Sequence, residues 1–203
     1  MTDTVWPSFA ISLLLGYLLG SIPFGLLFAW ASGAGDVRKI GSGNIGATNV
    51  LRTGNRWAAA LTLLFDAGKG LAAVLIARRL FGIGPALVAG MGAFVGHCFP
   101  VWLGFRGGKG VATFLGIMFA LNPIGGAGVA ISWLGAAAIW RISSLSALIA
   151  AGLAPFYLLM LREPANAALA ALLACAIFIM HLGNIRRLIA GTEPRIGAKN
   201  AGA

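Results

Sequence analysis

Long apolar segments, separated by short and mostly basic connections, constrain this chain more than any other feature. The first runs from Pro7 to about Ser32 and has Trp6 and Trp30 near its ends, as is typical of a helix anchored at both membrane interfaces. Charged residues make up 10% of the 203 residues and hydrophobic ones 59%, whereas about a quarter of an average globular domain is charged. The composition excludes an ordinary soluble domain and predicts an all-α integral membrane protein.

Six further apolar segments follow, and with the first they predict a polytopic bundle of seven transmembrane helices in one domain, residues 1–203. Segment 111–122 is shorter than the roughly 20 residues of a perpendicular crossing, so it either begins further back or crosses only in part. Pro23 should kink the first helix because proline removes a helical hydrogen bond. The other segments are 57–79, 82–103, 123–140, from Ser143 or Ser144 to about 161, and from 165 to about 190.

The net charge of +10 is assigned to cytoplasmic loops and anionic membrane lipids rather than to nucleic acid, since no basic stripe occurs apart from the membrane segments. If the seven helices alternate in direction, one face receives only Arg78, Arg79 and Arg162. The positive-inside rule then makes the other face cytoplasmic, with the N-terminus outside and the C-terminus in the cytoplasm. That richer face carries Arg38, Lys39, Arg52, Arg56, Arg106, Lys109, Arg141, Arg186, Arg187, Arg195 and Lys199.

A glycine-rich stretch from Gly41 to Asn49 lies in the first basic loop, followed by Arg52 and Arg56. Glycines let the backbone turn several N–H groups toward one point, and such concave runs of amides bind anions, phosphate above all. The alternative is a merely flexible loop. Its place at the membrane edge between two apolar segments favours a phosphate site, to which Ser42, Asn44, Thr48 and Asn49 add neutral hydrogen-bonding groups.

A second glycine-rich basic turn, Phe105 to Thr113, leads into the segment 111–122. It is similar to half a phosphate loop, but the full spacing of that motif is absent, so nucleotide hydrolysis is not supported. Amides at the start of a helix, together with Arg106 and Lys109, should still attract a phosphate.

Polar residues inside the apolar segments are open to two interpretations. His181 and Asn184 are one helical turn apart, so both can face one ligand, although a histidine at a helix end is commonly a structural hydrogen bonder. Asp66 and Lys69 are three residues apart and form either a structural ion pair or part of a site lining. The two cysteines have no zinc-type spacing, so no metal is expected.

Three blocks resemble those of the membrane-embedded glycerol-3-phosphate acyltransferases that use acyl phosphate as donor: GSGNIGATNVLR (Gly41–Arg52), GHCFPVWLGFRGGKGVAT (Gly96–Thr113) and HLGNIRRLIAGTE (His181–Glu193). The resemblance implies a bacterial inner-membrane enzyme with its active site facing the cytoplasm. Its substrates would be acyl phosphate and glycerol 3-phosphate, and its products lysophosphatidic acid and inorganic phosphate. It also implies that no metal, nucleotide or other cofactor takes part.

Roles for individual residues follow from that resemblance. The first block would hold a phosphate or the developing oxyanion, the second block and Arg52 the second phosphate, and the third block glycerol phosphate. His97 would either bind substrate or be structural, and Glu193 would pair with a basic residue as a structural group. The expected catalytic residues are Ser42, Arg52, Lys109, His181 and Asn184, and the expected substrate-binding residues are Gly43, Asn44, Gly46, Thr48, Asn49, His97, Arg106, Gly107, Gly108 and Gly110.

Two other functions fit part of the pattern. A transporter of a phosphorylated metabolite would also use an intramembrane Lys69 and glycine-broken helices, but the chain shows no convincing internal repeat. A non-catalytic scaffold would bind anionic lipid through the basic face.

Overall fold

The computed structural model describes residues 5–197, and this part of the chain contains helices and turns but no strand. It forms two compact units, one ending at Leu121 and the other beginning at Asn122. The single domain over 1–203 stays a prediction. Lys199, counted above with the cytoplasmic charges, lies outside the described residues.

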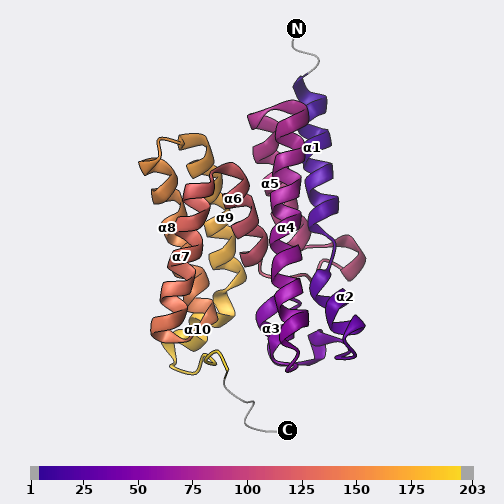
Figure 1. Ribbon diagram of the computed structural model, residues 1–203, viewed down its shortest axis with the longest axis vertical. Helices are drawn as coiled ribbons and strands as arrows, with labels where there is room; N and C mark the ends of the chain where they lie inside the picture. The colour runs from indigo at the N-terminus through magenta and orange to yellow at the C-terminus, as the bar shows by residue number, and fades with distance from the viewer. Residues whose placement is uncertain (1–4, 198–203) are drawn as a thin grey trace. The chain divides into compact units, whose positions relative to one another are not determined.

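Six helices form the first unit, and in it α1 packs along α5 while α4 contacts α1, α2, α5 and α6 (Figure 1). Two short 3-10 turns, η1 (Val37–Lys39) and η2 (Val101–Leu103), lie in its two long loops. The helices are α1 (Val5–Gly20), α2 (Phe24–Ala31), α3 (Ala47–Leu51), α4 (Arg56–Phe81), α5 (Ile83–Cys98) and α6 (Val111–Leu121).

Glycines at four-residue spacing let α1 and α5 approach closely. A Cβ added at Gly16 would overlap the carbonyl oxygen of Ala89, and one added at Gly96 would overlap that of Tyr17. Between helices in lipid there is little hydrophobic driving force, so backbone contact at small residues supplies much of the attraction.

The kink predicted at Pro23 is a complete break between α1 and α2. Proline has no N–H to continue the helical bonding, and the carbonyls at the break find donors from distant segments. Trp102 Nε1 donates to the Ser21 carbonyl at 2.7 Å, and Lys69 Nζ donates to the Ile22 carbonyl at 2.8 Å. A break of this kind is tolerated at membrane depth when neighbouring groups satisfy the freed backbone.

In the second unit, α8 packs against both α7 and α9 (Figure 1). Asn122 Oδ1 accepts hydrogen bonds from the amides of Ile124 and Gly125, each at 3.0 Å, ahead of Pro123 in the first turn. The helix thus has the bounds predicted for the segment 123–140. The helices are α7 (Pro123–Trp140), α8 (Ser143–Met160), α9 (Pro164–Met180) and α10 (Leu182–Ile189).

The single last helix predicted over 165–190 is wrong. The chain bends by 64° between α9 and α10, and His181 is both the last cap of α9 and the first cap of α10. While α9 is apolar, α10 carries Arg186 and Arg187 in its last turn. A basic amphipathic helix is better placed along a membrane interface than across the apolar core.

Among the described residues, five segments are long and apolar enough to cross a membrane, or six if the bent pair α9–α10 counts as one. The first of them, Trp6–Ala31, contains the break at Pro23. The remaining predicted span corresponds to α6, which has 11 residues against the roughly 20 that a crossing needs. Seven spans and their orientation therefore stay predictions.

Candidate functional site

The first basic loop is seated on α2 and α4 by a small apolar cluster. Ala29 of α2, Val37 and Val50 of the loop segment, and Ala58 and Ala59 of α4 are buried together. Gly25 of α2 approaches the Ile45 carbonyl so closely that a Cβ there would overlap it. The glycine-rich stretch is thus fixed on the helix that follows the Pro23 break.

Asn49 organises the interior of this loop. Its side chain is buried, and its Nδ2 donates to the carbonyls of Val37, Ile40 and Asn44 at 2.7, 3.0 and 2.7 Å. Its Oδ1 accepts from the amide of Ser42 at 3.1 Å. Because these donors are used within the loop, Asn49 shapes the glycine-rich stretch, and its direct contact with a ligand stays a prediction.

Ser42 and Arg52 are brought together on the outer side of Asn49. Ser42 Oγ lies 3.3 Å and Arg52 Nη1 3.5 Å from Asn49 Oδ1. The backbone around Ser42 is left-handed at Gly41 and Gly43, with φ of 53° and 68°, a conformation that glycine adopts without strain.

The other predicted residues of the first block are placed by the turn into α3. Asn44 Oδ1 accepts from the Gly46 amide at 2.9 Å, so one oxygen of the expected ligand set is used locally. Gly46 is the N-terminal cap of α3, and Thr48, in its first turn, is exposed.

One charge of this loop is already neutralised. Arg38 Nε and Nη2 donate to the Asp36 carboxylate at 2.9 and 2.7 Å. The hydrogen bonds from Arg38 lower the pKa of Asp36 to about 2. The carboxylate therefore stays ionised at neutral pH, which leaves Lys39 and Arg52 as the cations closest in sequence to the glycines.

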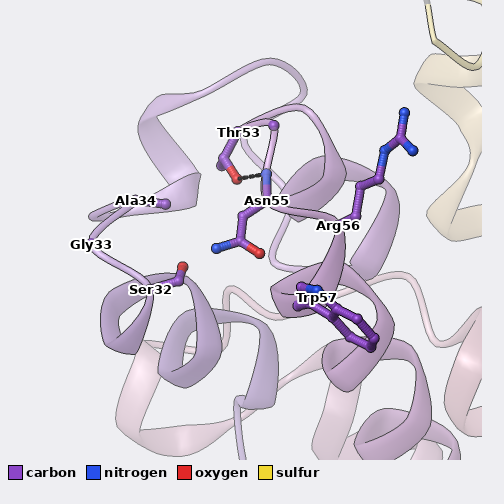
Figure 2. Close-up of a pocket in the computed structure, with 8 residues that line it drawn as sticks. Ser32, Gly33, Ala34, Thr53, Asn55, Arg56 and Trp57 are labelled. Atoms are coloured by element: carbon purple, nitrogen blue, oxygen red, sulfur yellow. Dashed lines mark hydrogen bonds between the residues drawn. The ribbon is translucent and has the colours of Figure 1, made fainter.

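A shallow pocket lies beside the loop, between the end of α2 and the start of α4 (Figure 2). In Figure 2 the Asn55 side chain points toward Ser32, while the Arg56 side chain points away. The catalytic and substrate-binding residues predicted from the sequence do not line it. Its lining is Ser32, Gly33, Ala34, Thr53, Gly54, Asn55, Arg56 and Trp57.

The second basic loop folds back onto the end of α5. The amides of Gly107 and Gly108 donate to the carbonyls of Cys98 and His97, both at 3.0 Å. Both amides are therefore used within the fold of this structure, and phosphate binding by Gly107 and Gly108 stays a prediction. The last carbonyls of a helix lack intrahelical donors, and here the glycine amides supply them.

Glycine is required where this loop meets α5. A Cβ at Gly108 would overlap the Nε2 atom of His97, and one at Gly110 would overlap the Phe94 ring. Arg106 is exposed and Lys109 is half-buried, so the cations of the loop remain the candidates for an anion.

Both loops adjoin the same short region of the first unit, which a shared pocket requires. The second loop is bonded to the α1–α2 break through Trp102 and the Ser21 carbonyl. The first loop lies against Gly25, four residues further along the chain.

The ion pair considered for Asp66 and Lys69 is present and buried. Lys69 Nζ lies 2.7 Å from Asp66 Oδ1, and both side chains are 2% exposed. His97 Nδ1 lies 3.6 Å from the same oxygen, and its ring is 3% exposed. His97 is thus an interior group that contacts Gly108 and Asp66, and the structural alternative for it is favoured over direct contact with substrate.

In the second unit, His181 is held by its own helix. Its Nδ1 lies 2.8 Å from the Ile177 carbonyl oxygen. A carbonyl only accepts, so this hydrogen bond assigns the proton to Nδ1 and makes Nε2 the acceptor of the neutral ring. That tautomer suits a group that receives a proton or a hydroxyl hydrogen bond.

Glu193 gathers the polar groups of the third block. Its carboxylate accepts from Asn184 Nδ2 at 2.5 Å, from Ser144 Oγ at 2.7 Å and from Arg187 Nε at 2.7 Å. Partial burial raises the pKa of Glu193, but these three donors outweigh it and hold the pKa below its usual value. The expected pairing with a basic residue is made with Arg187.

Sequence reasoning missed two partners of the site. Ser144 was considered only as a possible start of an apolar segment, yet it donates to Glu193, 49 residues away. Trp102 gave no polar signal, yet its indole satisfies the Ser21 carbonyl. Both contacts join segments distant in the chain, and no local spacing encodes them.

The fold and these loops define a multi-pass helical membrane protein whose glycine-rich basic segments are suited to anionic, phosphate-bearing ligands. The chain belongs to the glycerol-3-phosphate acyltransferase family, whose profile matches residues 10–191.

Curated relatives match over nearly the whole chain. A glycerol-3-phosphate acyltransferase of Cereibacter sphaeroides is 60% identical over 91% of this chain and 88% of its own length. One of Methylorubrum extorquens is 57% identical over 96% of both. The fold is similar to the crystal structure of PlsY (YgiH), an integral membrane glycerol 3-phosphate acyltransferase in its glycerol 3-phosphate form. The TM-score is 0.88 at 38% identity, covering 94% of this chain and 96% of that one.

Proposed function

We propose that this membrane acyltransferase moves a fatty acyl group from acyl phosphate to the 1-hydroxyl of sn-glycerol 3-phosphate. The products are lysophosphatidic acid and inorganic phosphate, in phospholipid biosynthesis. The similarity to PlsY carries the assignment, because that protein has structures in both a glycerol 3-phosphate form and a lysophosphatidic acid form. Two cationic loops attached to one region of the first unit support it, since both substrates carry phosphate.

The reaction mainly requires the protein to align the two substrates and to compensate their negative charge. Acyl phosphate is a mixed anhydride, and its leaving group departs as phosphate without strong acid catalysis. The enzyme must hold two anions side by side, offset their repulsion and stabilise the carbonyl oxyanion. The acyl chain lies among apolar helices while the headgroups stay at the basic loops.

Residue roles follow the contacts. Ser42 and Arg52 meet beside Asn49, so Arg52 is assigned with Ser42 to the first phosphate or the oxyanion and no longer to the second phosphate. Gly43, Asn44, Gly46 and Thr48 form the backbone around them. Lys109 and Arg106, with the Gly110 amide, bind the second phosphate.

In the third block, Asn184 and His181 orient glycerol phosphate. In the His181 tautomer set by Ile177, Nε2 is the ring nitrogen that can accept the hydroxyl proton, unless a substrate phosphate with a second pKa near neutrality takes it.

The bundle is proposed to have seven spans in a bacterial inner membrane, with the N-terminus outside and the catalytic loops and C-terminus in the cytoplasm. The excess of basic residues in both glycine-rich loops and in the C-terminal segment, against three on the other face, supports this orientation.

Phosphate release from palmitoyl phosphate tests this function directly. Purified protein should release phosphate and form lysophosphatidic acid only when glycerol 3-phosphate is also present. Vesicle uptake of labelled glycerol 3-phosphate without product would select a transporter, and headgroup binding without phosphate release would select a scaffold.

Replacing Arg52 or Lys109 by alanine should lower kcat/KM by about 100-fold or more, since a lost charged contact to phosphate is worth several kcal/mol. Arg38→Gln, which removes an exposed cation already paired with Asp36, is the matched control.

A further inference from the structure

Three buried ionisable side chains, Asp66, Lys69 and His97, form a cluster that the proposed chemistry does not use. Asp66 and Lys69 come from α4 and His97 from the last turn of α5. All three side chains are at most 3% exposed. The cluster therefore lies within the helices of the first unit and does not face bulk solvent.

Burial makes such a cluster costly to keep. Removing two charges from water is compensated only when geometry and further hydrogen bonds are good, and a pair of apolar residues often stabilises a fold as well or better. Here Lys69 Nζ has Asp66 at 2.7 Å and the Ile22 carbonyl at 2.8 Å, with the Phe24 ring 5.7 Å away. The polar contacts of Lys69 point to the α1–α2 break and not to a ligand.

His97 connects the cluster to the second basic loop. One edge of its ring faces Asp66 Oδ1. The other edge meets Gly108 so closely that a Cβ there would overlap Nε2, and the His97 carbonyl accepts the Gly108 amide. The ring is thus clamped between the buried carboxylate and the backbone of the residue that precedes Lys109.

We propose that the Asp66–Lys69 pair is a positioning device for the second basic loop. It holds the His97 ring, and through that ring it sets the backbone on which Lys109 is carried. Asp66, Lys69 and His97 are positioning residues that do not touch the substrate. The phosphate role of Lys109 in this inference rests on the proposed function. The packing of the Asp66–Lys69 pair, His97 and the second basic loop does not.

A double variant, D66N/K69M, removes both charges and so avoids leaving one buried and unpaired. Lys69→Met alone leaves Asp66 uncompensated and is expected to fold poorly. In the folded double variant, the KM of one phosphate-bearing substrate should rise by about tenfold while kcat falls much less, because a displaced cation weakens binding of the substrate it contacts. A lower yield of folded enzyme with both KM values unchanged would indicate a merely structural role and overturn the proposal.

Cys98 provides a second measurement that does not depend on activity. Its side chain is 1% exposed, and its carbonyl accepts the Gly107 amide, so release of the loop should uncover it. Cys175 is exposed and is replaced by alanine to leave Cys98 as the one thiol, since the sequence has two cysteines.

In this background, D66N/K69M should increase the rate at which Cys98 reacts with a maleimide by about tenfold, through local opening. Arg38→Gln should leave it unchanged. The proposal would be overturned if the rate of Cys98 labelling and both KM values in D66N/K69M stay within about twofold of the parent protein. A twofold change corresponds to a free-energy difference below RT. Wild-type protein that releases no phosphate would instead defeat the proposed function, while faster Cys98 labelling in the double variant would still support the packing.

Discussion

At the scale of single residues, the same residue type serves two different purposes in the first loop. Asn44 uses its side-chain oxygen for one local turn, whereas Asn49 is buried and bonds three carbonyls. Both are asparagines in a glycine-rich stretch, so the sequence alone assigned both to ligand binding. Only the fold distinguishes the residue that builds the loop from those that the loop presents.

Asn49→Asp should therefore destabilise the protein more than Asn44→Asp. The Asn49 change removes the amide donors to three loop carbonyls and places a buried carboxylate beside them, at a cost of roughly 1–3 kcal/mol. The Asn44 change keeps the oxygen that accepts from Gly46. Thermal unfolding in detergent measures the difference. Equal shifts for the two variants would contradict the structural role of Asn49.

At the scale of helices, sequence signals located most helix boundaries but did not predict the bend between α9 and α10. Proline and asparagine mark the break at Pro23 and the start of α7 at Pro123, since each removes or supplies a defined backbone bond. The bend at His181 has no proline, and it depends on where the apolar part of the last segment meets its arginines. The use of Gly107 and Gly108 to cap α5 was equally hidden, because glycines that bind an anion and glycines that fold back onto a helix have the same composition.

The contact between α1 and α5 predicts unequal effects for two glycine-to-alanine changes. Gly16→Ala places a methyl group against the backbone of Ala89, whereas Gly68→Ala adds one in open space on α4. Overpacking should cost about 1–3 kcal/mol in the first variant, while helix propensity should make the second neutral or slightly stabilising. Melting temperatures of the purified variants compare them, and a similar loss for both would indicate that close packing of α1 and α5 is unimportant.

The network around Glu193 predicts a dependence on pH. The donors from Ser144, Asn184 and Arg187 hold its folded-state pKa below 4.5, the value of an isolated glutamate. The network's stabilisation is therefore complete above that value and is lost as pH falls through the lower folded pKa. The melting temperature should drop below pH 4.5 less steeply in Glu193→Gln than in the wild type. Parallel pH profiles for the two proteins would exclude this group as the source.

At the scale of the whole molecule, the sequence predicts that blocks belonging to two compact units act together on two phosphate-bearing substrates. Block order and charge allowed that prediction, and within the first unit Ser21 to Gly25 adjoins both loops. Binding measurements can test the part that involves the third block. Lys109 of the first unit and Asn184 of the second are the residues to combine.

Alanine at Lys109, at Asn184 and at both should give non-additive losses of kcat/KM. Residues without a shared partner change free energies independently, while those that hold the same ligand couple by about 0.5–3 kcal/mol. A substrate already misplaced by the loss of Lys109 has less to lose from Asn184, so the double variant should be impaired less than the product of the single effects. The losses of kcat/KM for Asn44→Asp and Asn184→Ala should be non-additive in the same way. Those for Arg38→Gln and Asn184→Ala should add, because no shared ligand is proposed for that pair. Strict additivity for Lys109 with Asn184 would mean that the two blocks act independently.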